Sequence, residues 1–459
     1  MIFSSYIFVL LFLPLTVAGY FLLSRFNHNA GKALLLIASF IFYAYFNVSY
    51  FWLLAGSLIF NYFWGELLHR EKSIFLLWIG ISANLLLLGY CKYYDFFVEN
   101  INFIFQANYP LKHILLPLGI SFFTFQQISY LAEVREGTLP RKYSLLSYSL
   151  FVTFFPQLVA GPIVLPGEMM PQFDDPKNRY PNFRNLSAGL FVFALGFSKK
   201  ILLADNFAII ADAAYAMKNP GFLDAWYGAF AYMFQLYFDF SGYCDMAIGI
   251  GLMFNILLPV NFSSPLKSAN IQEFWRTWHI TLGRFLSQFI YKKLGGSRKG
   301  EFHACLNIFI TFLLCGLWHG ASYLYVIFGA LHGTAMIIHR IWKNGKRTMS
   351  RYAGMSITLL FFVLSLIIFR SSGVKECKKM FLGLVNFDPV LIPPFFEEIS
   401  KNNILLVISG IVIVFFFPPA NTFREKFKPT LLNFLITLLL LTASLFELNK
   451  ISPFIYFNF

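Results

Sequence analysis

The chain has 459 residues, of which 58% are hydrophobic and only 13% are charged. Soluble domains average roughly 45–50% apolar and about 25% charged residues, so this composition excludes an ordinary soluble protein. The formal net charge of +14 is spread over short loops such as 25–32 and 340–351, which is typical of membrane topology signals. A nucleic-acid-binding protein is not expected, because its basic residues would gather in one patch or stripe.

Apolar runs long enough to cross a bilayer recur along the whole chain. The first run, 2–23, has no Lys or Arg before it and no small-residue cleavage site after it, so we expect a retained helix and no cleaved signal peptide. Further helices are expected at 33–46, 50–64, 73–91, 111–131, 143–160, 186–204, 224–238, 242–257, 303–318, 321–339, 352–369, 404–418 and 430–446. Gly and Pro interrupt several runs, so some helices are expected to be broken or re-entrant.

These runs predict an all-α polytopic membrane protein with 11 to 14 transmembrane or re-entrant helices. We expect one multi-span membrane domain, 1–446, followed by an aromatic tail, 447–459. Cytoplasmic loops are enriched in Lys and Arg, and the basic loops of this chain then place both termini outside the cytoplasm.

Two histidines lie beside tryptophans in this apolar chain. His319 follows Trp318, and His279 follows Trp278. An imidazole in the bilayer is costly unless it faces a partner or a water-filled cavity, so each is a candidate functional residue. The sequence contains no metal, Walker or dinucleotide motif, and the pattern favours acyl transfer. The alternatives are a core histidine and, for His319, a thiol–imidazole pair with Cys315.

The most polar internal block contains a predicted helix at 271–286. At 3.6 residues per turn its polar and its bulky apolar side chains fall near different faces. The two sets are Gln272, Arg276 and His279, and Trp275, Trp278 and Leu282. The segment is either an interfacial amphipathic helix or a helix that enters the protein core and lines a reaction chamber.

Asp239 is an acidic residue in a largely apolar stretch. Asp245 is six residues away and does not share its helix face, so a paired-carboxylate site is not expected. Asp239 is expected to form a buried ion pair with Arg276 or Arg284, or to contact substrate.

Two further polar residues interrupt apolar segments. Gln157 lies between Pro156 and the pair Gly161-Pro162, which break the helix and either expose backbone carbonyls or simply end a loop. His332 either packs in the core or lines the reaction chamber.

Four passages together resemble the membrane-bound O-acyltransferase family, in the bacterial branch that includes alginate and peptidoglycan O-acetylation. Their order and spacing match the family across about 110–340. The passages are Phe154–Ile163, Tyr237–Ala247, Glu273–Leu282 and Leu317–Ala321. The resemblance implies a bundle of helices around a central tunnel, with a donor pocket that opens to the cytoplasm.

By the same resemblance, His319 matches the catalytic histidine and His279 the second active-site histidine. A histidine has an unperturbed pKa of about 6.5, which suits His319 as a general base for hydroxyl attack on a thioester. His279 is expected to orient the donor or to donate a hydrogen bond to the developing oxyanion. The other expected tunnel-lining residues are Trp275, Arg276, Trp278, Asp239, Trp318 and Gln157. Thr277 departs from the branch, which often has Arg or Asn there.

The resemblance implies an O-acetyltransferase of the bacterial inner membrane that acts for an envelope polysaccharide such as alginate-like exopolysaccharide or peptidoglycan. The expected donor substrate is acetyl-CoA or a similar acyl thioester, with no bound cofactor and no metal. The expected partners are membrane lipid and a periplasmic esterase-like (SGNH-type) acetyltransferase. A transporter is the alternative, because intramembrane His and Asp also suit solute pathways.

The C-terminal tail has four aromatic residues in its last six positions. It is either an aromatic anchor at the membrane interface or a segment that folds back and brings Tyr456 to His319. Similar aromatic tails occur in the bacterial branch of the family, where the tyrosine is thought to carry the acyl group. The phenol has an ordinary pKa of about 10, so it loses its proton more readily than a sugar hydroxyl.

Overall fold

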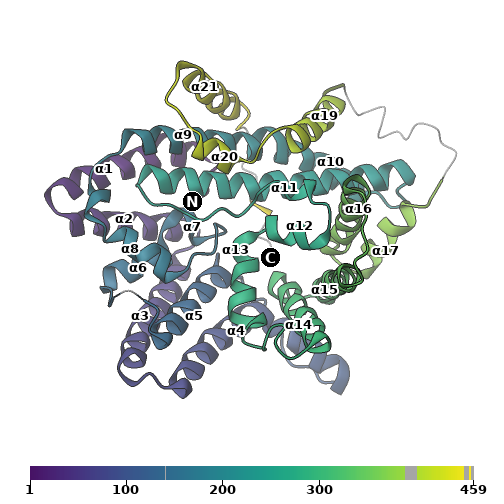
Figure 1. Cartoon of the computed structure of the whole chain (residues 1–459), viewed down its shortest axis with the longest axis horizontal. Coiled ribbons are helices and arrows are strands. Elements are labelled where there is room, and N and C mark those ends of the chain that lie inside the picture. The colour runs from purple at the N-terminus through teal and green to yellow at the C-terminus, as the bar shows by residue number, and fades with distance from the viewer. Residues whose placement is uncertain (140, 388–400, 449–453, 456–459) are drawn as a thin grey trace. The chain divides into compact units, whose positions relative to one another are not determined.

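The computed structural model describes residues 1–139, 141–387, 401–448 and 454–455, with only the backbone of 401–403 (Figure 1). In this part of the chain all regular secondary structure is helical, which confirms the all-α fold class. Tyr456 and most of the aromatic tail lie outside the described residues.

The described residues form two compact units that alternate along the sequence. Unit 1 contains 1–195, 243–259 and the described residues from 426 onward, and unit 2 contains 196–242 and the described residues of 260–425. Helices α9 (Phe183–Ser198) and α11 (Phe222–Met253) each contribute residues to both units.

Unit 1 is a bundle of helices whose starts coincide with Asn and Ser residues. The side chains of Asn27, Asn47, Ser73 and Ser144 accept hydrogen bonds from backbone N–H groups of the first turn, which would otherwise lack partners. Its elements are η1 (Ile7–Phe12), α1 (Leu13–Phe26), α2 (His28–Ala44), α3 (Val48–Glu71), α4 (Ile74–Phe105), α5 (Ile120–Glu136), α6 (Leu145–Thr153), α7 (Phe155–Leu158), α8 (Pro166–Phe173), η2 (Pro176–Arg179) and α21 (Leu431–Phe446).

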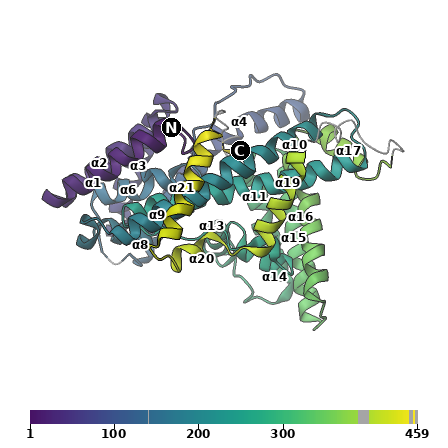
Figure 2. The same cartoon turned by 90° about the horizontal axis from the view of Figure 1, so that it is seen from above.

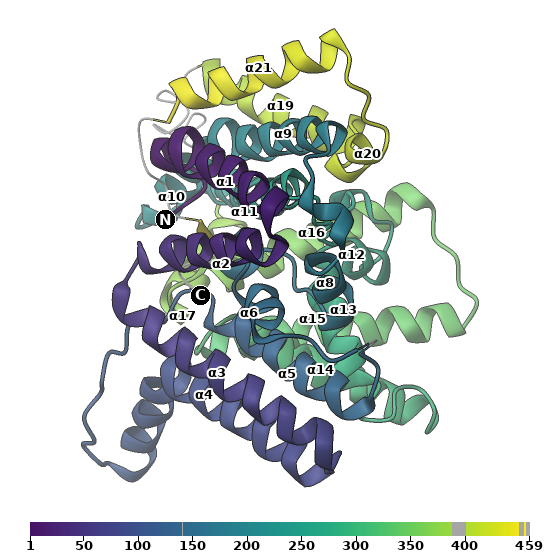
Figure 3. The same ribbon diagram turned by 90° about the vertical axis from the view of Figure 1, so that its left-hand side faces the viewer.

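Helices α3, α4 and α5 pack together (Figure 3). Buried amide side chains join them: Asn61 donates to Gln127 at 2.6 Å, and Asn84 donates to Asn61 at 2.7 Å. Such hydrogen bonds hold helices together in lipid, where apolar side chains gain little from leaving the bilayer.

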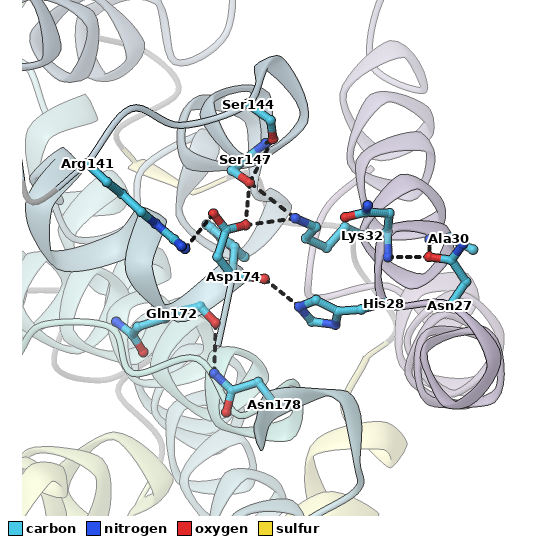
Figure 4. A network of polar contacts seen from close by, with 12 residues as sticks. Asn27, His28, Ala30, Lys32, Arg141, Ser144, Ser147, Gln172, Asp174 and Asn178 are labelled. Atoms are coloured by element: carbon cyan, nitrogen blue, oxygen red, sulfur yellow. Dashed lines mark hydrogen bonds and ion pairs between the residues drawn. The ribbon is translucent and has the colours of Figure 1, made fainter. Parts of the chain in front are cut away.

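A second polar cluster joins α2, α6 and the segment after α8 (Figure 4). Asp174 lies at its centre, 2.7 Å from the Lys32 ammonium and 2.9 Å from the Arg141 guanidinium, and it accepts a hydrogen bond from Ser147 at 2.6 Å. Burial alone raises the pKa of the Asp174 carboxyl. Hydrogen bonds from Lys32 and Ser147 and the charges of Lys32 and Arg141 outweigh burial and hold this pKa below its usual value.

Unit 2 holds the helical hairpin α14–α15, with α16 packed against α15 (Figure 2). Its elements are η3 (Lys199–Ala204), α10 (Asp205–Ala216), η4 (Pro265–Lys267), α12 (Ile271–Thr277), α13 (Ile280–Leu286), η5 (Ser287–Tyr291), α14 (Glu301–His319), α15 (Tyr323–Asn344), α16 (Arg351–Arg370), α17 (Val374–Gly383), α19 (Lys401–Phe416) and α20 (Ala420–Glu425).

Seven helices in the described part of the chain are long and apolar enough to cross a membrane, so the protein is a multi-pass membrane protein. They are Ile7–Phe26, Val48–Glu71, Ile74–Phe105, Phe183–Ala216, Glu301–His319, Tyr323–Asn344 and Arg351–Arg370. Two shorter apolar helices, Ile404–Phe416 and Leu431–Phe446, follow them. The total of 11 to 14 stays a prediction.

Several of the expected helix boundaries are wrong, and the expected helix 143–160 is broken at Phe154 into α6 and α7. The runs 224–238 and 242–257 belong largely to one 32-residue helix, α11. Gly242 does not break this helix; a Cβ there would come within 2.7 Å of the Gly196 carbonyl oxygen, so glycine permits close packing. The helix expected at 111–131 begins only at Ile120, because Gly119 adopts a left-handed φ of 71°.

Candidate active site

His319 is the last residue of α14. Its side chain is 4% exposed, and its ring packs edge-on against Phe369 and Phe328, with centroids 5.1 Å and 6.1 Å away. The helix ends there because Gly320 is extended, and a Cβ on Gly320 would lie 2.2 Å from the Tyr325 ring. The close approach of Tyr325 therefore requires the glycine that follows the histidine.

Glycines also bring α14 and α15 together. A Cβ on Gly316 would lie 2.2 Å from the Tyr325 carbonyl oxygen, and one on Gly329 would lie 2.4 Å from the Phe312 carbonyl oxygen. Gly333 follows Gly329 at the four-residue spacing that lets helix backbones approach closely in membranes. This hairpin places His319 at the end of one helix and His332 between the two glycines of the other.

His279 occupies the break between α12 and α13, with a left-handed backbone, φ 45° and ψ 51°. It is 1% exposed. A non-glycine residue rarely adopts this conformation, and such strained residues cluster at functional sites. The expected continuous helix 271–286 is therefore wrong. His279 and Arg276 do not share a helix face, since His279 is buried and Arg276 is exposed.

The buried side chain of Asn261 holds this break in place. The Ile280 N–H donates to the Asn261 backbone oxygen at 3.0 Å, and the Thr281 N–H and hydroxyl donate to Asn261 Oδ1 at 3.1 and 2.9 Å. His279 Nδ1 lies 3.2 Å from the same Oδ1. A backbone N–H can only donate, which fixes the amide orientation of Asn261. Nδ1 of His279 then carries the proton, and its Nε2 is a hydrogen-bond acceptor.

This tautomer modifies the expected role of His279. The neutral ring donates toward Asn261 only, so it cannot also donate to an oxyanion unless it takes up a second proton. It can accept a hydrogen bond from a substrate N–H or O–H group. Orientation of the donor, the other expected role, fits this geometry.

His332 is a third buried histidine, and both of its nitrogens are bonded. The Trp275 indole N–H donates to Nδ1 at 3.2 Å, and Nε2 lies 3.1 Å from the Ser365 hydroxyl, which itself donates to the Phe362 carbonyl at 2.8 Å. Because an indole only donates, Nε2 of His332 carries the proton. Of the two interpretations left open by the sequence, this geometry favours a packing role that fixes Trp275.

The three histidines belong to one cluster of ring contacts within unit 2. The centroid distances along it are 6.0 Å for His279–Trp318, 5.0 Å for Trp318–His319, 6.1 Å for His319–Phe328, 4.3 Å for Phe328–His332 and 5.2 Å for His332–Trp275. Trp278 packs beside this cluster, against Phe274 and Phe262. Most of the aromatic residues expected at the site are thus brought together with the histidines.

Asp239 forms the expected buried ion pair, but with a different partner. Its carboxylate lies 2.7 Å from the ammonium of Lys200 in η3, and Lys200 also lies 2.8 Å from Asp205. The exposed Arg276 does not pair with Asp239 in the described part of the chain, whereas pairing of Asp239 with Arg284 stays a prediction. Lys200 lies in an apolar span, and nothing in the residue pattern indicates that its side chain turns toward α11.

Gln157 and the described tail residues, 454–455, lie in unit 1. Gln157 is buried and donates to the Phe151 carbonyl at 2.8 Å, so it stabilises the break between α6 and α7. Phe454 is buried and stacks on Tyr243, with ring centroids 4.7 Å apart. Tyr243 also stacks on Phe3 at 4.7 Å. The described end of the tail is therefore packed among helices of its own unit.

Residues 21–374 match the model of the membrane-bound O-acyltransferase family. The chain is 42% identical to a peptidoglycan O-acetyltransferase of Helicobacter pylori, over 87% of this chain and 83% of the relative. It is 40% identical to a probable alginate O-acetylase of Pseudomonas putida, over 84% of this chain and 81% of the relative. A teichoic acid D-alanyltransferase of Streptococcus thermophilus is 27% identical over 51% of this chain and 59% of the relative.

Proposed function

Because this chain belongs to the membrane-bound O-acyltransferase family, we propose that it transfers an acetyl group from a cytosolic thioester to a hydroxyl group of a cell-envelope polysaccharide. The observation that carries the proposal is His319, buried at the end of α14 in one cluster with His279. The names of the two relatives near 40% identity, which refer to peptidoglycan and alginate, support acetyl transfer to such a polymer. Family membership also decides against the transporter alternative.

In the proposed reaction His319 acts as general base. The hydroxyl oxygen attacks the thioester carbonyl, its proton passes to His319, the C–S bond breaks, and the proton passes on to the leaving thiolate. An imidazole can both take up and release the proton in these two steps, and such proton transfer typically contributes roughly 10²–10⁴-fold in rate. His279 orients the donor molecule through its acceptor Nε2, which accepts a hydrogen bond from an N–H or O–H group of the donor away from the thioester.

Acetyl-CoA is the proposed donor, and alginate-like exopolysaccharide or peptidoglycan is the proposed acceptor. A donor inside the cell and an acceptor outside it require a protein in the bacterial inner membrane. A periplasmic SGNH-type transferase is the proposed partner for the final step.

A test of this proposal supplies acetyl-CoA labelled in the acetyl group to inverted membrane vesicles that contain the protein. Label should appear in envelope polysaccharide or in the protein, and vesicles with His319→Ala should show none above background. Equal labelling in vesicles that lack the protein would contradict the proposal.

We also propose that Tyr456 carries the acetyl group between the two sides of the membrane. Phe454, two residues earlier, is packed inside unit 1, which supports a tail that enters the protein. The phenol oxygen would take the acetyl group from the thioester with loss of its proton to His319. The aryl ester would then pass it to a second hydroxyl and regenerate the phenol.

Tyr456→Phe tests the relay, since it removes one oxygen and keeps the ring. This variant should lose polysaccharide acetylation, whereas the neighbouring control Phe457→Leu should retain it. Normal acetylation by Tyr456→Phe would contradict the relay without affecting the role of His319.

A further inference from the structure

A cavity of about 530 Å³ lies between α15 and α16, and residues 269–271 also line it. The two helices run beside each other in Figure 2 and are joined by the loop 345–350. The volume falls in the range of roughly 300–1,000 Å³ that is usual for ligand sites. We call it the α15–α16 cavity.

One end of the α15–α16 cavity is basic. Lys343, Arg347 and Arg351 line it and are exposed, and none of the described residues that line the cavity is acidic. Arg347 lies over the Trp342 ring at 5.4 Å, and Arg351 lies 3.8 Å from Glu273 just outside the cavity. Even with Glu273 counted against Arg351, two positive charges remain at this end, which suits a phosphate group.

The rest of the cavity is largely apolar, with Thr334 and Thr358 among its polar lining residues, and much of it lies on helices that can span a membrane. Ile338 on α15 and Ile357 on α16 line it, and they are 60% and 56% exposed. Phe361 lies further along α16. On a membrane-spanning helix, exposed isoleucines face hydrocarbon, so this part of the cavity suits an acyl chain that enters from the bilayer.

We propose that the α15–α16 cavity binds an anionic phospholipid, with the phosphate at Lys343 and Arg347 and an acyl chain along Ile338 and Ile357. Basic pockets between transmembrane helices recognise anionic headgroups in this way. A coenzyme A thioester fits less well, because the amide groups of its pantetheine arm would meet an apolar wall and lose their hydrogen bonds. The proposal does not depend on the acetyl-transfer reaction.

The α15–α16 cavity borders the histidine cluster at Phe361. Phe361, which lines the cavity, contacts the His332 ring with centroids 4.9 Å apart, and His332 accepts the hydrogen bond of Trp275. A bound acyl chain would therefore pack against a residue that supports α12. Lipid occupancy is expected to stabilise this part of unit 2.

The test measures lipid binding to the purified full-length protein by native mass spectrometry. Phosphatidylglycerol and phosphatidylcholine with the same acyl chains are titrated separately. Phosphatidylglycerol should bind at least tenfold more tightly. Lys343→Gln with Arg347→Gln should weaken its binding ~30-fold, which corresponds to about 1 kcal/mol for each charge. The matched control Arg298→Gln with Lys299→Gln removes two exposed charges elsewhere in unit 2 and should leave binding unchanged.

A second variant tests where the acyl chain lies. Ala335 lines the cavity, and Ala335→Phe should fill it and reduce retention of both lipids while circular dichroism shows unchanged helix content. Equal affinity for the two lipids, equal loss in the control variant, or undiminished binding to Ala335→Phe would overturn the proposal. Displacement of phosphatidylglycerol by acetyl-CoA would also overturn it and assign the cavity to the donor.

Discussion

At the scale of single residues, the site depends on how each imidazole is held. Asn261 holds His279 in a left-handed backbone conformation, which costs a non-glycine residue on the order of 1–3 kcal/mol. Trp275 and Ser365 hold His332 through both nitrogens. These bonds set the two tautomers: in His279 they leave Nε2 as the acceptor for substrate, and in His332 they engage both nitrogens in packing.

The tautomer of His279 predicts different results for its two amide replacements. The side-chain amide of Asn lies about where Nδ1 of a histidine lies, and the longer side chain of Gln places its amide about where Nε2 lies. His279→Gln should keep more acetyl-transfer activity than His279→Asn, and both should lose less than His319→Ala. Transfer rates at saturating and limiting donor concentrations measure this difference. Equal activities for the two variants would contradict the role assigned to Nε2 of His279.

Trp275→Phe should lower stability by about 1–3 kcal/mol, because it leaves the buried Nδ1 of His332 without its donor. The measurement is thermal unfolding in detergent. Trp78→Phe, at a residue 60% exposed, is the matched control and should change little. If both variants unfold at the wild-type temperature, the hydrogen bond contributes nothing to stability.

At the scale of elements, small residues and polar clusters set how the helices pack. Gly316 and Gly329 let α14 and α15 approach until a single Cβ would overlap the facing backbone. In unit 1, Asp174 binds Lys32 of α2 and Ser147 of α6. Each of these contacts holds one helix against another. The contacts in the α14–α15 hairpin also position His319 and His332.

Gly329→Ala should destabilise the protein by roughly 1–3 kcal/mol and reduce activity, because its methyl group would lie 2.4 Å from the Phe312 carbonyl oxygen. Gly89→Ala is the matched control. Its methyl group would meet nothing within 4 Å, and alanine favours a helix over glycine by about 1 kcal/mol. Thermal unfolding of both variants measures the difference, and equal stability would contradict the packing assigned to Gly329.

Asp174→Asn should destabilise the protein by about 3–5 kcal/mol at neutral pH, because it leaves the buried Lys32 ammonium without its counter-charge. The pKa of Asp174 is lowered in the folded protein. Its contribution is therefore complete above the pKa of the unfolded chain, about 3.9, and is lost as the pH falls through the folded value. Unfolding measured from pH 7 to pH 2 should show a constant gap between wild type and variant above about pH 4 and a narrowing gap below it. A gap that already closes between pH 7 and pH 5 would contradict this account.

At the scale of the whole molecule, the sequence predicted the helices well and their contacts poorly. The apolar runs 352–369 and 430–446 differ from α16 and α21 by no more than one residue at either end, because burial in lipid depends on local composition. The motif histidines were found because an imidazole is conspicuous in an apolar run. Roles that depend on distant partners were not predictable: Asn261 is 18 residues from His279, and Trp275 is 57 from His332.

The central claim is that this membrane protein transfers an acyl group with His319 as the base. The most direct test is acetyl transfer from labelled acetyl-CoA by the purified protein in proteoliposomes, with wild type compared against His319→Ala. His319→Ala should lose transfer at least a hundredfold while it keeps its helix content and membrane insertion. Retention of more than about a tenth of the wild-type rate would contradict the claim, because general-base removal typically costs roughly 10²–10⁴-fold.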